Sequence, residues 1–153
     1  MKEIFLYVDA DACPVKDEIL KVSYRHHMPV YIVSNQWMRL EVGPLVQKIV
    51  VPDGPDLADD WIADHISNRD IAITADILLA KRCLDAGAIA IGPTGKVFSP
   101  DNIGMAVAMR DLNAHLRESG ASKGYNASFT NADKSRFLQA LESAIQTKLK
   151  IIK

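Results

Sequence analysis

The sequence has few of the residues that form disulfides in small secreted domains or bind zinc. It has only two cysteines, Cys13 and Cys83, which lie 70 positions apart and belong to no CxxC pair. Its four histidines show no spacing typical of metal ligands. A disulfide framework and a zinc site are therefore not expected, and two reduced, buried cysteines fit a cytoplasmic protein.

Long apolar runs are also missing. No run approaches the roughly 20 residues that a membrane-spanning helix needs. The N-terminal stretch MKEIFLYVDADAC has a short apolar segment but reaches acidic residues too soon for a signal peptide. We therefore expect a chain that neither crosses nor enters a membrane and that stays in the cytoplasm.

There is no excess of positive charge. The chain has 18 lysines and arginines against 19 acids, a net charge of −1, so the whole chain carries no nucleic-acid signature. Residues 1–78 hold 13 acids and 7 bases, whereas residues 79–153 hold 6 acids and 11 bases, so the balances of −6 and +5 sum to −1. This asymmetry is consistent with an acidic centre beside a basic surface, or simply with solvated helix faces of uneven sign.

Short apolar runs alternate with helical patterns along the 153 residues, a length that suits one domain. The runs are continuous, as expected for strands covered on both faces, and lie at 4–8, 30–33, 48–51, 71–74 and 88–91. Helical patterns cover 14–22, 56–67, 77–86 and 102–119, and a last helix begins after a cap at Thr130 or Asn131. We predict an α/β fold of three layers, in which a parallel sheet of about five strands has helices on both faces. Residues 1–153 form one domain, with 102–153 as a helical C-terminal extension packed on it.

Aspartates gather where this fold would bind a ligand. In a parallel sheet, the carboxyl ends of the strands and the N-termini of the following helices share one edge. Asp9 and Asp11 close the first strand, Asp76 follows the fourth, and Asp59 and Asp60 begin the helix after the third. Carboxylates crowded together repel unless a cation compensates them, and oxygen ligands suit Mg²⁺ or Mn²⁺. We therefore predict a divalent-metal site for phosphodiester hydrolysis.

Some of these acids also have purely structural explanations. Aspartate is a preferred helix cap, which accounts for Asp56 without any function, and Asp53 fits the turn PDGP. Asp11 suits a helix cap as well as it suits a metal site. The sequence does not choose between Asp59 and Asp60.

Other polar residues would share the same edge or its surroundings. Ser34, Asn35 and Thr74 end strands there and are predicted to touch substrate. The bases predicted to contact phosphates are Lys81, Arg82 and Arg110.

Five segments of the chain resemble one family. They are VDADACPVKDEI (8–19), VPDGPDLADDWIADHI (51–66), ITADILLAKRCLDAGA (73–88), NIGMAVAMRDLNAHLRESG (102–120) and DKSRFLQALESAI (133–145). Together they are similar to the bacterial YaiI/YqxD family, which itself looks like a relative of the PIN and NYN nuclease-like domains. The resemblance implies a PIN-like fold whose acids follow the first strand, begin a middle helix and follow the fourth strand. Asp9, Asp59 or Asp60, and Asp76 fall on those positions.

Three functions follow as hypotheses. The first is a Mg²⁺- or Mn²⁺-dependent nuclease acting on RNA rather than DNA, with Asp9, Asp76 and one or both of Asp59 and Asp60 holding metal. In this hypothesis Asp11 holds metal or orients water. The second is a non-catalytic module of the same fold that binds nucleic acid or protein. The third is a phosphatase of the haloacid dehalogenase kind, because Asp9-Ala10-Asp11 copies its DxD motif, although the acidic pair Asp59-Asp60 then stands in the wrong order.

Overall fold

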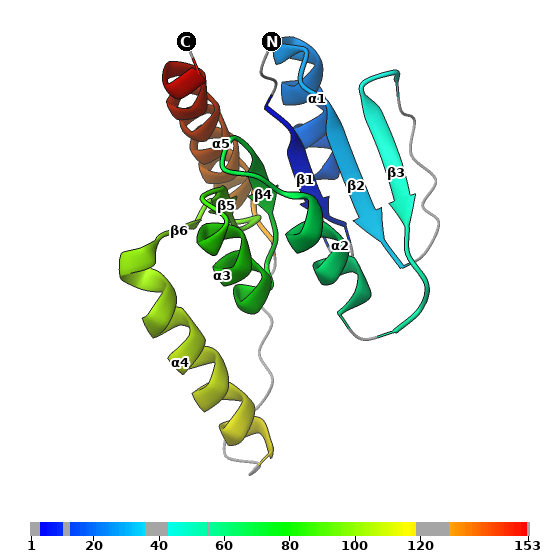
Figure 1. The fold of residues 1–153 in the computed structure, drawn as a ribbon. Helices are drawn as coiled ribbons and strands as arrows, with labels where there is room; N and C mark the ends of the chain where they lie inside the picture. The colour runs from blue at the N-terminus through cyan, green and yellow to red at the C-terminus, as the bar shows by residue number, and fades with distance from the viewer. Residues whose placement is uncertain (1–3, 11–12, 36–42, 55, 119–128, 153) are drawn as a thin grey trace.

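A six-stranded sheet forms the centre of the computed structural model, which describes residues 4–10, 13–35, 43–54, 56–118 and 129–152 (Figure 1). Its strands are β1 (Leu6–Asp9), β2 (Val30–Ser34), β3 (Val46–Val50), β4 (Ile71–Ile73), β5 (Ile89–Ile91) and β6 (Val97–Phe98). They lie in the order β3-β2-β1-β4-β5-β6, and every neighbouring pair is parallel except β5 and β6. The prediction of a parallel α/β sheet is confirmed, and β6 adds a short antiparallel edge.

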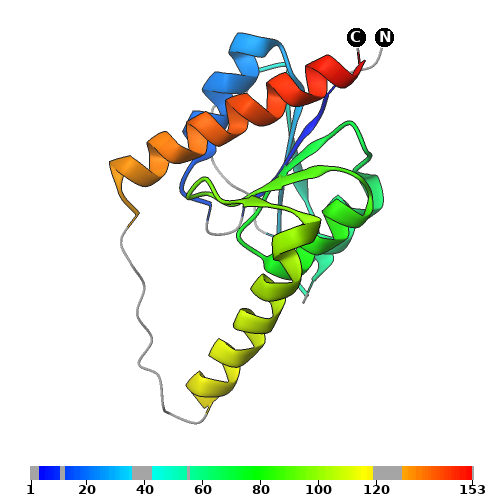
Figure 2. The ribbon, with the colours of Figure 1, turned by 90° about the vertical axis from the view of Figure 1, so that its left-hand side faces the viewer.

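The helices cover both faces of this sheet. They are α1 (Lys16–His26), α2 (Leu57–His65), α3 (Ile77–Asp85), α4 (Pro100–Glu118) and α5 (Asn131–Ile152). Helices α1 and α5 pack on one face and α2 and α3 on the other, while α4 extends away from the body (Figures 1 and 2). No helix in the part of the chain described here combines the length and the apolar character that crossing a membrane requires.

Alternation along β1 decides which side chains face which helices. Leu6 and Val8 belong to the apolar cluster under α1 and α5, whereas Tyr7 belongs to the cluster under α2 and α3. Because successive side chains of a strand point to opposite faces, Asp9 lies on the same face as Tyr7. The strand therefore aims its last carboxylate toward α2 and α3.

The order of the strands also marks where a ligand would bind. From β1 the chain adds β2 and β3 on one side, and then returns to place β4 and β5 on the other. Between β1 and β4 the direction of winding reverses, and the crevice outside the carboxyl ends of two such strands is the usual ligand site of an open α/β sheet. Asp9 ends β1, and Thr74 directly follows β4.

Helix α5 contributes side chains to the hydrophobic core. Phe137, Leu141 and Ile145 are fully buried against the sheet. The helix begins in a capping box, because the Thr130 hydroxyl accepts from the Asp133 N–H at 3.1 Å and an Asp133 carboxylate oxygen accepts from the Thr130 N–H at 3.0 Å. Of the two predicted caps, Thr130 is therefore the one used.

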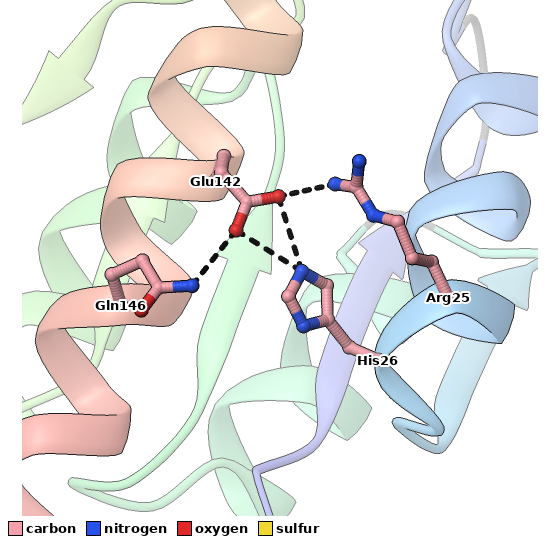
Figure 3. A network of polar contacts seen from close by, with 4 residues as sticks. All are labelled: Arg25, His26, Glu142 and Gln146. Atoms are coloured by element: carbon pink, nitrogen blue, oxygen red, sulfur yellow. Dashed lines mark hydrogen bonds and ion pairs between the residues drawn. The ribbon is translucent and has the colours of Figure 1, made fainter.

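A polar network fastens α5 to α1 (Figure 3). The Glu142 carboxylate accepts from Gln146 at 3.0 Å, meets the His26 imidazole at 3.1 Å and pairs with Arg25. These contacts lower the pKa of Glu142, chiefly through the Gln146 hydrogen bond and then through His26. The network lies away from the strand ends and serves to hold the two helices together.

Candidate active site

Asp9 is held in place by Thr74. The Thr74 hydroxyl donates to Asp9 Oδ2 at 2.9 Å and accepts from the Asp76 backbone N–H at 2.9 Å. Thr74 is buried, so its hydroxyl serves the two aspartates, and in this structure it is not open to a substrate. This contact joins the end of β1 to the start of α3 across the reversal point of the sheet.

Asp76 is the N-cap of α3. Its Oδ1 accepts from the backbone N–H groups of Leu78 at 2.9 Å and Leu79 at 3.2 Å. Such a cap stabilises a helix by about 1 kcal/mol. Both bonds fall on one oxygen, and the Asp76 side chain also forms a hydrogen bond with Asp59. A residue predicted as a metal ligand is therefore also a structural cap.

Asp59 and Asp60 are neighbours in the chain but contact different residues. Asp59, in the first turn of α2, reaches Asp76 by a hydrogen bond and lies close enough to Asp9 to feel its charge. Asp60 forms an ion pair with Arg82 of α3, with 2.8 Å between Oδ1 and NH1. Asp59 thus joins the acids at the strand ends, whereas Asp60 links two helices at the surface.

The crowding of negative charge alters the protonation of Asp59. Burial, and then the charges of Asp76 and Asp9, raise the pKa of Asp59 from its ordinary 3.8 to about 7. The hydrogen bond to Asp76 and the charge of Asp56 act in the same direction. Near neutral pH this carboxyl therefore exchanges a proton easily, and a bound cation would displace that proton.

A small cavity of about 100 Å³ opens beside these acids, and we call it the acidic pocket. Its lining residues are Asp9, Asn35, Gly54, Asp56, Leu57, Ala58 and Asp59. Asp56 occupies the N-cap position of α2, as predicted, but it has φ 65° and its side chain forms no capping hydrogen bond. Asp56 is instead one of the residues that line the pocket, which the structural interpretation of the sequence missed. The local signal was the pair Asp53-Gly54, which marks a tight turn before the helix.

The other predicted residues lie in varied surroundings. Asn35 lines the acidic pocket, whereas Ser34 is buried at the end of β2. Lys81 forms an ion pair with Asp85 of its own helix at 3.4 Å, and Arg82 forms one with Asp60. Both side chains are therefore already paired with acids. Arg110 lies on α4 and Asp11 lies outside the described residues.

The donor set of the pocket is made of oxygen atoms from carboxylates and one side-chain amide. Within the described ranges, no three His, Cys, Asp or Glu side chains are arranged so as to hold one metal ion between them. Mg²⁺ typically needs only one or two protein carboxylates and completes its shell with water and substrate phosphate. Asp9 and Asp59 satisfy that smaller requirement, and their chemistry fits Mg²⁺ or Mn²⁺ better than a softer metal.

Comparison of the sequence with known proteins finds a family and several relatives. The model of a bacterial family described as uncharacterised, the YaiI/YqxD family, matches residues 7–147. A UPF0178 protein of Agrobacterium fabrum is 58% identical over 137 residues, which cover 90% of this chain and 90% of the relative. Another from Rhizobium meliloti is 57% identical over 137 residues, covering 90% and 94% of the two chains. No solved structure matches the chain at a significant level.

Proposed function

The chain belongs to the YaiI/YqxD family, and we propose that its acidic pocket holds Mg²⁺ or Mn²⁺ and hydrolyses phosphodiester bonds in RNA. The observation that supports this most is the convergence of Asp9, Asp56 and Asp59 on one cavity at the carboxyl edge of the sheet. That edge, next to the reversal point between β1 and β4, is where open α/β sheets bind ligands. The choice of RNA rests on the similarity of the acid pattern to PIN and NYN nuclease-like domains.

Each residue has a role in this proposal. Asp9 and Asp59 hold the metal, and Thr74 fixes the orientation of Asp9 through its 2.9 Å hydrogen bond. Asp76 orients Asp59 and keeps the first turn of α3 in place, so it acts as a positioning residue. Asn35, on the wall of the pocket, offers its amide to a phosphate oxygen.

A bound divalent cation would supply an activated water and neutralise charge that develops on the phosphate. In this reaction the side chains of the protein would also take up and release protons. Asp59 exchanges a proton near pH 7 in the metal-free protein, but a bound cation would keep this carboxyl ionised as a ligand, so another carboxylate would take the proton of the attacking water. Asp56, which is exposed and lines the same pocket, is a further carboxylate that could take this proton.

Cleavage of a labelled single-stranded RNA by the full chain, with Mn²⁺ or with EDTA, tests the proposal. We expect cleavage only with the metal, its loss in Asp9→Asn and Asp59→Asn, and its retention in Asp60→Asn. Asp60 is the matched control because it is the next residue of the same helix turn and points to Arg82 instead. Cleavage that persists in Asp9→Asn would contradict the assignment.

A binding module without turnover is the second candidate. It is favoured by one observation, that the described side chains do not form a ready site of three metal ligands. Under this alternative the protein binds RNA in a salt-dependent way, and added Mn²⁺ produces neither cleavage nor a change in stability. The RNA assay and a metal titration therefore separate the two candidates.

A further inference from the structure

Helix α4 leaves an open surface beside the acidic edge. Its first turns pack on the body, where Ile103 and Ala106 are buried, and the rest of the helix projects past the carboxyl ends of the strands (Figures 1 and 2). Met105, Met109 and Leu112 are 69%, 46% and 49% exposed. Apolar side chains so exposed, and spaced along one side of a helix, indicate a surface that contacts something.

A groove of about 360 Å³ runs along this part of α4, and we call it the α4 groove. It is lined by Ile77 of α3, Lys96 of the β5–β6 turn, and a face of α4 that includes Met105, Met109, Arg110 and Asn113. The α4 residues recur at steps of three and four, so they form one stripe about 16 Å long. The groove thus has one rigid helical wall.

The charge of the α4 groove is positive. Its lining contains two cations and no carboxylate. Lys96 lies over the Phe98 ring at 5.5 Å and forms no ion pair with any residue that the structure describes. Among the described residues, Arg110 forms an ion pair only with its neighbour Asp111, at a loose 3.7 Å. Lys81 and Arg82 on the adjacent helix are instead paired with acids of α3 and α2, so of these four described cations the two in the groove are the more open to an anion.

The groove begins next to the acidic site. Ile77, in its lining, directly follows Asp76, whose side chain is bonded to Asp59. A strand lying in the α4 groove therefore passes the start of α3, one residue from Asp76, although the groove and the acidic pocket have no lining residue in common. A second copy of the chain is a poorer occupant, because a two-fold contact through this surface would set Lys96 and Arg110 against the same cations of the partner.

The geometry points to the α4 groove as the strand-binding subsite for single-stranded RNA, in which Lys96 and Arg110 contact phosphates and Met105 and Met109 pack against base faces. This inference rests on the proposed nuclease function, which it extends from the reacting phosphate to the flanking nucleotides. Unpaired strands present both a phosphate backbone and open base faces, which a duplex does not. Cations beside apolar side chains match that combination.

Binding in EDTA tests the groove separately from cleavage. Fluorescence anisotropy of a labelled ten-nucleotide single-stranded RNA is measured with the full chain and its Lys96→Glu and Arg110→Glu variants. Both side chains are exposed, so the substitutions do not disturb the core. We expect each variant to weaken binding by about tenfold at low salt and to reduce the slope of log Kd against log salt by about 0.7. Lys150→Glu, the same charge reversal at an exposed position of α5, is the matched control and should bind like wild type.

The outcomes distinguish this inference from the proposed function. Weaker binding in the groove variants but not in Lys150→Glu supports the groove, even if no RNA is cleaved and the nuclease proposal fails. Equal binding by all variants, or no binding by wild type, overturns the groove even if cleavage is found. A lower molar mass of Arg110→Glu than of wild type in light scattering, with RNA binding unchanged, assigns the surface to a second copy and also overturns it.

Discussion

Replacing Asp59 by asparagine should stabilise the metal-free protein at high pH. The folded protein raises the pKa of Asp59 from 3.8 to about 7, so folding makes ionisation of this carboxyl unfavourable. The neutral Asp59 carboxyl contributes to the stability of the folded state. This contribution is complete below pH 3.8 and is lost as the pH rises through about 7. Asparagine keeps the shape and can still donate to Asp76, but it adds no charge to the cluster. The difference in unfolding free energy between variant and wild type should therefore grow from pH 4 to pH 8.

The size of this effect follows from the pKa. A tenfold change in an ionisation constant is worth about 1.4 kcal/mol, so a rise from 3.8 to about 7 corresponds to about 4 kcal/mol before screening. Asp59 is only partly buried, and water screens its neighbours, which reduces the expected gain to about 1–2 kcal/mol at pH 8. Near pH 4 the two proteins should differ by only a few tenths of a kcal/mol, because the folded Asp59 is then neutral.

Urea unfolding followed by circular dichroism in EDTA, at pH 4, 6 and 8, measures this difference. Asp60→Asn is the control. It removes an exposed ion pair with Arg82 and should cost about 0–1 kcal/mol, with no gain at high pH. An Asp59→Asn variant that is no more stable than wild type at pH 8 would show that the carboxylates are not crowded.

The same variants report on the metal. A ligand that binds only the folded state at a hundred times its Kd stabilises it by about 2.7 kcal/mol. Mn²⁺ at such a concentration should stabilise wild type and Asp60→Asn at pH 7.5 and leave Asp59→Asn nearly unchanged. Equal stabilisation of all three proteins would place the metal away from the acidic pocket.

Three further substitutions test the scaffold by urea unfolding. Asp70→Ala should cost about 3 kcal/mol, because this buried carboxylate accepts two backbone N–H groups and one hydroxyl at 2.8–3.1 Å; a loss below 1 kcal/mol would contradict that reasoning. Phe137→Ala should cost about 3–5 kcal/mol by leaving a cavity between α5 and the sheet, and a variant of unchanged stability would show that α5 is not part of the core. Glu142→Gln should cost about 1 kcal/mol at pH 7, where the ionised carboxylate is stabilised by Gln146 and His26. Its pKa lies below the ordinary 4.5, so that cost should shrink as the pH falls toward 4 and below, and a constant cost would exclude the charge as its source.

The sheet could be predicted because each parallel strand is a continuous apolar run. Strands β1, β2, β4 and β5 begin and end within two residues of the predicted runs, and β3 begins two residues before its run. Strand β6 was missed because it has two residues, Val97 and Phe98, which are too few for any period. Its pairing with β5 depends on the tight turn around Gly95, whose φ of 95° favours glycine.

The candidate site was predictable as an edge but not as a set of contacts. Topology alone brings Asp9, Asp59 and Asp76 to the same end of the sheet. It cannot choose between Asp59 and Asp60, because adjacent helix residues point about 100° apart and both belong to the first turn. The choice depends on Arg82, one turn into a different helix, which takes Asp60. Likewise, the sequence around Asp56 is that of an ordinary cap, and only the structure shows that Asp56 lines the pocket and makes no capping hydrogen bond.

The near-zero net charge is compatible with the proposed binding of an anionic strand. At physiological ionic strength the field of a charge decays over about 8 Å, so a phosphate responds to the charges beside it and hardly to the total of −1. The acids that line the pocket, Asp9, Asp56 and Asp59, would repel a strand unless a cation neutralises them. Lys96 and Arg110 lie in the adjacent groove without strong acidic partners among the described residues, and can hold the flanking phosphates. Under this proposal the two signs of charge are separated in space while their total stays near zero, so the whole-chain composition would give no nucleic-acid signature.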